Sequence, residues 1–201
     1  MNEILPGVFT WPWFSERHGY DFNGYLVCHP SGNVCIDPVE MSDAVLEELA
    51  RQGVARIALT NRNHFRASMK VRGRTGARLA IHPADAGFAR EKGVVVDDDL
   101  LPGGRLGPFT VVGAPGKSPG EVALHWPERR ILMVGDACVG KPPGHCALLP
   151  AAVIDDLPRL QGSLRGLAAL EFDTLLLGDG ANLLSGGKAA LASLCGYFAP
   201  G

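Results

Sequence analysis

Polar side chains that could carry chemistry stand in loops that follow short apolar segments. The first of these loops contains His64 and Arg66, a second contains Lys117, and two later loops contain Asp136 and Asp179. Histidine and aspartate side chains transfer protons and bind metal ions, and loops at strand ends are common places for such chemistry. These five residues are therefore the first candidates for a functional site.

Two further residues, His145 and Cys138, are weaker candidates for the functional site. His145 also lies in a loop and could act as a general base, although a surface or structural role is the alternative. Cys138 could border the same site, but a nucleophilic cysteine needs a base and an electropositive setting. The chain has five cysteines, an odd number without C-x-x-C spacing, which favours reduced thiols and a cytoplasmic location.

Turn residues and apolar periodicity indicate many short elements. The expected strands cover residues 23–28, 33–37, 56–60, 78–81, 109–113, 121–126, 130–135 and 174–177. The expected helices cover residues 42–53, 156–170 and 188–198. Strands followed by helices in each half of the chain favour two sheets that pack face to face with helices outside. Residues 1–201 are expected to form a single domain.

Bulk composition excludes several classes of function. The chain has 201 residues, of which 46% are hydrophobic, and its formal net charge is −2. Such a charge gives no general attraction to nucleic acid or to an anionic membrane. Neither a secretory signal nor an apolar run long enough to cross a bilayer is found in the sequence. We therefore expect neither a nucleic-acid partner nor a membrane partner.

Five stretches resemble, in the right order, the metallo-β-lactamase superfamily. They are NGYLVCHPSGNVCIDP, LTNRNHFRAS, GARLAIHPAD, APGKSPGEVALHWPERRILMVGDAC and LLLGDGANL. They are similar to the family's first hairpin, its metal loop, the following strand, the segment from its PGHTPG turn to its GD turn, and its GHG turn. The resemblance implies an α+β fold, a four-layer αββα sandwich with two mixed sheets face to face and helices outside. It also implies a relationship to metal-dependent hydrolases.

The metal-binding motif departs from the family's pattern. The family's metal loop reads H-x-H-x-D-H after Thr or Ser, and Thr60 provides that anchor. The positions that correspond to metal ligands hold Asn61, Asn63, Phe65, Arg66, Lys117, Asp136 and Asp179. Only Asp136 keeps the family's residue type. Asn is a poor zinc ligand, Phe is none, and Arg or Lys repels a cation, so we expect no metal cofactor.

The replacements suggest a specific arrangement. Arg66 and Lys117 would take the place of the metal ions and neutralise Asp136 and Asp179, because buried charges need partners. Two asparagines, at positions 61 and 63, would satisfy the remaining lone pairs. A shorter loop register would instead place His64 at a ligand position. In that alternative, one divalent metal ion would be held by His64, Asp136 and Asp179.

Three functions remain open. The first is a charged pocket, without metal, for an anionic small molecule. The second is a hydrolase that works at the same pocket with one metal or none, with Asp136, His64 and Asp179 as catalytic residues. The third is assembly, since short members of this family often pair as homodimers. Eight basic residues between positions 51 and 78 form either a solvated basic face or an anion site.

Overall fold

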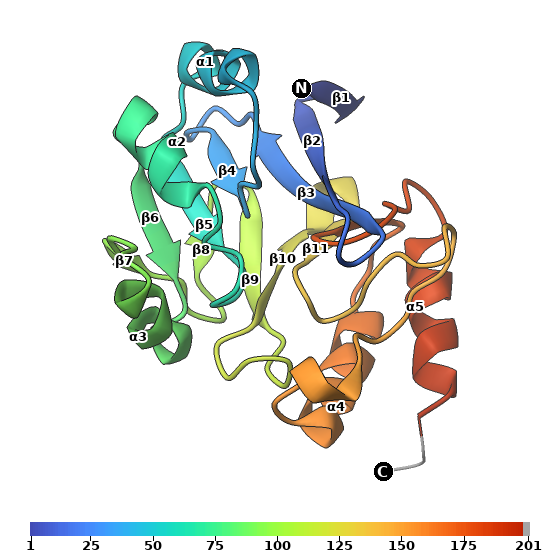
Figure 1. Ribbon diagram of the computed structural model, residues 1–201. Helices are drawn as coiled ribbons and strands as arrows, with labels where there is room; N and C mark the ends of the chain where they lie inside the picture. The colour runs from blue at the N-terminus through green and yellow to red at the C-terminus, as the bar shows by residue number, and fades with distance from the viewer. Residues whose placement is uncertain (199–201) are drawn as a thin grey trace.

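The computed structural model describes residues 1–198 and contains two mixed β-sheets that face each other (Figure 1). The strands of the larger sheet are β1 (Asn2–Leu5), β2 (Val8–Ser15), β3 (Tyr20–Val27), β4 (Val34–Ile36), β5 (Arg56–Leu59), β6 (Arg78–Ile81) and β7 (Asp98–Asp99). Those of the smaller sheet are β8 (Arg105–Leu106), β9 (Phe109–Gly113), β10 (Val122–Trp126), β11 (Ile131–Val134) and β12 (Thr174–Leu177).

Sheet topology is antiparallel at one end and parallel at the other. In the larger sheet, β1 to β4 pair antiparallel and β4 to β7 pair parallel, in sequence order. In the smaller sheet the order is β12-β11-β10-β9-β8, and only β11 and β12 pair parallel. The antiparallel arrangement expected for residues 109–135 is confirmed by these pairings.

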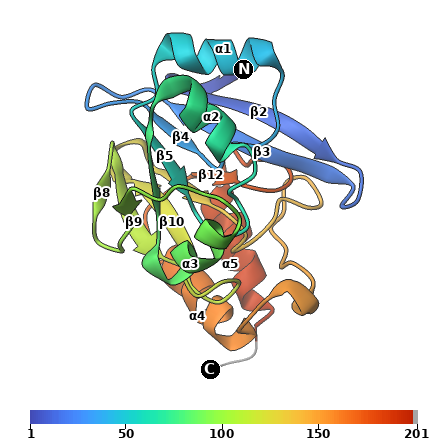
Figure 2. The same cartoon turned by 60° about the vertical axis from the view of Figure 1, so that its left-hand side comes forward.

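Five α-helices cover the outer faces of the sheets (Figures 1 and 2). They are α1 (Asp43–Gln52), α2 (Ser68–Thr75), α3 (Pro83–Glu91), α4 (Leu157–Ala168) and α5 (Gly187–Gly196). Two short 3-10 helices cover Pro127–Arg129 and Ala151–Val153. None of the helices in residues 1–198 is long and apolar enough to span a membrane.

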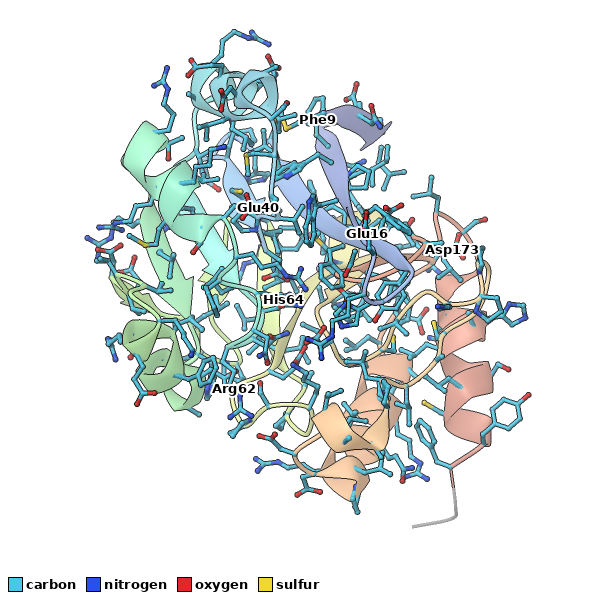
Figure 3. All side chains as sticks on the ribbon, in the orientation of Figure 1. Phe9, Glu16, Glu40, Arg62, His64 and Asp173 are labelled. Carbon is cyan, nitrogen blue, oxygen red and sulfur yellow. The ribbon has the colours of Figure 1, made fainter. Side chains whose placement is uncertain are left out.

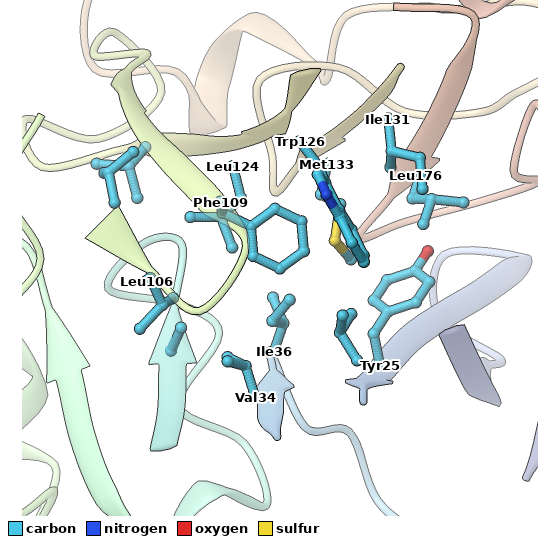
Figure 4. Close-up of a cluster of buried hydrophobic side chains, with 14 of the residues drawn as sticks. Tyr25, Val34, Ile36, Leu106, Phe109, Leu124, Trp126, Ile131, Met133 and Leu176 are labelled. Carbon is cyan, nitrogen blue, oxygen red and sulfur yellow. The ribbon is translucent and has the colours of Figure 1, made fainter. Parts of the chain in front are cut away.

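Three apolar clusters fill the spaces between the four layers. The central cluster joins the two sheets and contains Phe109 and Trp126, whose rings meet edge to face (Figure 4). A second cluster packs α1, α2 and α3 on the larger sheet, and a third packs α4 and α5 on the smaller one. In β12, Leu176 belongs to the central cluster while Leu175 and Leu177 face the helices, which is the alternation that strands impose. The expected four-layer αββα sandwich is present.

Several elements were absent from the sequence expectation, among them the short strands β7 and β8. The N-terminal strands β1 and β2 form a hairpin that is paired with β3. Helix α3 begins directly after β6, where His82 accepts a hydrogen bond from the Ala84 backbone N–H and Pro83 occupies the first turn. Strand β6 therefore ends and helix α3 begins at the His82-Pro83 pair.

Candidate functional site

The site is built around His64, which is fully buried near the centre of the molecule (Figure 3). Its Nε2 lies 3.0 Å from Asp136 Oδ1, and its Nδ1 lies 2.8 Å from Asp37 Oδ2. Asp37 follows β4 and also accepts hydrogen bonds from the backbone N–H and hydroxyl of Thr60, at 2.8 and 2.5 Å. Both ring nitrogens of His64 thus face carboxylates from different elements.

Electrostatics favour the imidazolium form of His64. Burial and Arg66 lower the pKa of this imidazole, but Asp37 and Asp136 outweigh them and raise the pKa to about 10. Burial raises the pKa of Asp136, but the cations His64 and Lys117 outweigh burial and hold that pKa far below its usual range. His64 is therefore an internal cation at neutral pH.

Lys117 is a second internal cation. It lies between β9 and β10, is only 6% exposed, and its Nζ is 2.6 Å from Asp136 Oδ2. The same ammonium donates to Asn63 Oδ1 at 2.5 Å. One carboxylate oxygen of Asp136 thus contacts His64, and the other contacts Lys117.

Arg66 is the third cation of the cluster. Its Nη2 donates to Asp179 Oδ1 at 3.3 Å, and the guanidinium lies 4.0 Å from the centre of the Phe22 ring. Its Nη1 is buried and has no hydrogen-bond partner among residues 1–198. Burial and the charge of Asp136 raise the pKa of Asp179 to about 6, despite the opposing effect of Arg66.

Glu121 supports the site from behind. Its Oε1 accepts hydrogen bonds from the Asp136 backbone N–H at 2.7 Å and from Asn61 Nδ2 at 3.3 Å. Burial and the Asp136 charge raise the pKa of Glu121 well above its usual range, so the folded protein favours the protonated form of this side chain. Its Oε2 is buried without a partner in the described part of the chain.

Two glycines allow the loops to approach each other. A Cβ on Gly135 would lie 2.2 Å from Thr60 Oγ1 and 2.9 Å from Glu121 Oε1. A Cβ on Gly178 would lie 2.8 Å from His64 Cε1. These glycines immediately precede Asp136 and Asp179, so both carboxylates depend on a position where no side chain fits.

Asp85 of α3 holds two loops of the site together. It is fully buried, and its Oδ2 accepts from the Arg62 backbone N–H at 2.9 Å and from Ser118 Oγ at 2.6 Å. Its Oδ1 accepts from the Gly120 backbone N–H at 2.9 Å. The loop that carries Lys117 and the loop that carries His64 are therefore fixed to one carboxylate.

The structure brings together most residues expected from the sequence, with two corrections. Arg66 and Lys117 were expected to neutralise Asp136 and Asp179, without a specified pairing, and the structure contains the ion pairs Lys117–Asp136 and Arg66–Asp179. Phe65 was expected in the pocket, but it packs against the apolar cluster beneath helices α1 to α3. The two asparagines were expected to satisfy the aspartates, but Asn61 donates to Glu121 and Asn63 accepts from Lys117.

Sequence reasoning missed three supporting carboxylates, at positions 37, 85 and 121. Glu121 was read as the start of a strand, and the other two lie next to a strand end and a helix start. Charge alone does not distinguish these residues from surface carboxylates. A signal that could have found Glu121 is its place in a run whose neighbours Val122 and Ala123 are apolar, since such a run is usually buried on both faces.

The basic run of residues 51–78 is fully paired with carboxylates. The eight pairs are Arg51–Glu48, Arg56–Asp98, Arg62–Asp155, Arg66–Asp179, Lys70–Asp43, Arg72–Asp97, Arg74–Glu47 and Arg78–Asp98. Most of these pairs are at the surface. Apart from Arg66, which lies in the candidate site, the run therefore forms a paired face rather than a second anion site.

Comparison with known proteins identifies the family. The family model of the metallo-beta-lactamase superfamily matches residues 3–197. The chain belongs to the metallo-β-lactamase superfamily. A search of curated proteins gives no match.

Solved structures of this superfamily have the same fold. A protein named TTHA1623, in a di-iron-bound form, is 26% identical over 90% of this chain and 96% of its own, with a TM-score of 0.70. A metallo-beta-lactamase from Pontibacter korlensis is 18% identical over 98% of both chains, with a TM-score of 0.79. FIM-1 from Pseudomonas aeruginosa, in a mono-zinc form, is 16% identical over 96% of this chain and 93% of its own, with a TM-score of 0.77.

The residues of this site do not fit the family's pair of metal ions. Potential ligand atoms of His64, Asp136 and Asp179 lie within 4.8 Å of one another. However, Lys117 forms an ion pair with Asp136, and Arg66 forms one with Asp179. The positive charge that metal ions would bring is therefore already supplied by side chains. A bound divalent cation would have to displace these groups or lie beside them, which is electrostatically unfavourable.

Proposed function

We propose that this protein uses the superfamily's site as a charged pocket that binds a small anionic molecule without a resident metal ion. The observation that carries the proposal is the contact of Lys117 Nζ with Asp136 Oδ2 at 2.6 Å. Lysine and protonated histidine balance the carboxylates that a metalloenzyme would use as ligands. Zinc hydrolysis has therefore been lost, because a hydroxide held between two metal ions has no place in this arrangement.

Arg66 is the group that would bind the ligand. Lys117 already makes two short contacts, whereas Arg66 makes one contact of 3.3 Å and keeps Nη1 without a partner among residues 1–198. Guanidinium groups bind carboxylate and phosphate groups through paired N–H donors. The side chain of Arg66 is 18% exposed while Nη1 is buried, so an anion that pairs with Nη1 would have to enter beneath the exposed part of the side chain. The ligand would carry one carboxylate or phosphate group.

Tyr20 and Lys141 would form the entrance of this pocket. Lys141 Nζ lies 5.1 Å from the centre of the Tyr20 ring. Burial, together with the charges of Asp179 and Asp136, raises the pKa of Tyr20 to about 12. An entering anion would pass one lysine before it reaches Arg66.

A hydrolase with one metal ion is the second candidate, favoured by the proximity of His64, Asp136 and Asp179. A direct role for His64 as general base has less support, because the ring is fully buried and both nitrogens face carboxylates. The second candidate therefore requires Lys117 and Arg66 to move away from the two aspartates.

Elemental analysis tests the choice between the candidates. The protein is purified without chelator or affinity-tag metal and is measured before and after dialysis against zinc and manganese. Metal content well below stoichiometric in both states is expected. Stoichiometric metal that is lost in Asp136→Ala would overturn the metal-free proposal and lead to hydrolase assays.

Calorimetric titration tests the anion site directly. Inorganic phosphate and acetate are titrated into the wild type, into Arg66→Met, and into Arg74→Met as a control. Arg74 is an exposed arginine paired with Glu47 on the outer helices. Binding that is lost only in Arg66→Met is expected. Absence of binding to the wild type, or equal binding to all three proteins, would contradict the proposal.

A further inference from the structure

A groove separate from the charged cluster lies between strand β2 and the loop that leads into α1. Its volume is about 450 Å³, and small-molecule sites in proteins occupy roughly 300 to 1,000 Å³. Most of its lining is apolar and comes from Met1, Trp11, Pro12, Trp13, Met41 and Val45. None of the residues of the charged cluster lines this groove, so the anion pocket proposed above does not use it.

Trp11 forms the floor of the groove and is held on two sides. It is 4% exposed, and its Nε1 donates a hydrogen bond to the Val39 carbonyl at 3.3 Å. A Cβ on Gly24 would lie 2.6 Å from two ring carbons of Trp11, so the ring packs over a position where no side chain fits. The indole therefore joins β2 to the loop on the opposite side of the groove, and a ligand would meet a preformed floor.

Trp13 supplies an exposed aromatic wall. Its side chain is 42% exposed, and its ring contacts the Phe22 ring at a centroid distance of 5.8 Å. Indole rings attract apolar groups through their area and cations through the negative charge of their faces. The wall thus suits a ligand that has an apolar body and a positive charge.

Glu40 determines the charge of the groove. It is the only charged side chain among the lining residues, is exposed, and forms no ion pair with any residue from 1 to 198. Lys70 reaches the same loop, but its Nζ donates to the Met41 carbonyl at 3.2 Å and lies 3.6 Å from Asp43 Oδ1. The start of α1 is capped by the Ser42 side chain and carries Asp43 in its first turn, so its positive end is already compensated.

We propose that this groove binds a small organic cation, in which an ammonium group is attached to an apolar or aromatic body. The ammonium group pairs with the Glu40 carboxylate, and the body lies on Trp11 and Trp13 with Met41 at its side. An uncharged molecule of the same shape would gain the apolar contacts alone, and an organic anion would be repelled by Glu40.

Nuclear magnetic resonance of the ¹⁵N-labelled full chain tests the proposal, because the three tryptophans give three separate indole N–H signals. The probe is phenethylamine at millimolar concentrations. The signals of Trp11 and Trp13 should shift and saturate, whereas the signal of Trp126, in the cluster between the sheets, should stay in place. Phenylethanol, which replaces the ammonium group by a hydroxyl, should bind at least about threefold more weakly.

Variants of two exposed glutamates separate pairing at the groove from a change of net charge. Glu40→Gln should weaken phenethylamine binding by at least about threefold, and Glu91→Gln, at the end of α3, should leave it unchanged. The proposal would be overturned by the lack of a saturable Trp13 shift in the wild type, by equal binding of amine and alcohol, or by equal losses in the two variants. The first two results come from the wild type and do not depend on the folding of a variant.

Discussion

The ammonium of Lys117 and the carboxylate of Asp136 meet at 2.6 Å inside the protein, where both side chains are almost inaccessible to solvent. A buried charge without its partner costs far more than the pair itself. The contact therefore makes Lys117 important for stability, because it neutralises Asp136 where water has almost no access.

Replacement of Lys117 by methionine should destabilise the protein by about 3 to 5 kcal/mol, because it leaves Asp136 buried with one partner fewer. Urea denaturation measures the change. The control is the double variant Lys117→Met with Asp136→Asn, which should recover part of the loss because no unpaired charge remains. If Lys117→Met alone matched the wild type, the two charges would not be coupled.

Replacement of Glu121 by glutamine should stabilise the protein at neutral pH by about 1 kcal/mol or more. The pKa of Glu121 is raised in the folded state, so the wild type loses stability as pH rises above the ordinary glutamate value of 4.5. Glutamine does not ionise and keeps the acceptor for the Asp136 N–H. Denaturation midpoints of the two proteins should converge below pH 4.5 and separate above it; a constant difference would show that Glu121 is charged.

The stabilising contribution of His64 should decrease as pH rises above 6.5, the ordinary pKa of histidine. Because its folded pKa is about 10 and its ordinary value is 6.5, the contribution is complete below pH 6.5 and disappears as pH rises to 10. The difference in unfolding free energy between wild type and His64→Gln should therefore shrink by about 1 kcal/mol or more between pH 6.5 and 9. His145→Gln, at an exposed loop position, is the control for removal of a histidine outside the site.

Replacement of Gly135 by alanine should cost about 3 kcal/mol, because the new methyl group would collide with Thr60 Oγ1. The matched control is Gly162→Ala in α4, where a Cβ meets no atom of the described residues within 4 Å. That change should stabilise the helix by up to about 1 kcal/mol. Thermal melts of the two variants should shift in opposite directions, and equal shifts would mean that the approach of the two loops is not required.

Local pattern was sufficient for most of the fold. Apolar runs flanked by turn residues predicted β5, β6, β9 and β12 to within a residue, because buried strands need little beyond hydrophobicity and length. Strand β2 was missed because Pro12 and the exposed Trp13 break the usual pattern. Pro12 is tolerated because β1 pairs only with residues nearer the start of β2, which leaves Pro12 beside β3 alone.

The site was predictable in its charges but not in its geometry. Family resemblance placed Arg66, Lys117, Asp136 and Asp179 in one cluster but did not show which cation pairs with which carboxylate. It could not position His64, because its place depends on how the loop after β5 turns and on Asp37 behind it. Phe65 shows most clearly what the sequence could not predict. It directly follows His64 in the same loop, yet its side chain packs against the apolar cluster beneath the helices.

The paired basic residues of positions 51–78 have a consequence for how the molecule behaves at a distance. Each positive group has a carboxylate beside it, although Arg56 and Arg78 share Asp98, so beyond roughly 10 Å in ordinary buffer their fields are largely cancelled. A polyanion such as heparin would have to break existing ion pairs before it could bind any of these basic side chains. The protein should therefore pass through a heparin column unretained, despite the eight basic residues between positions 51 and 78.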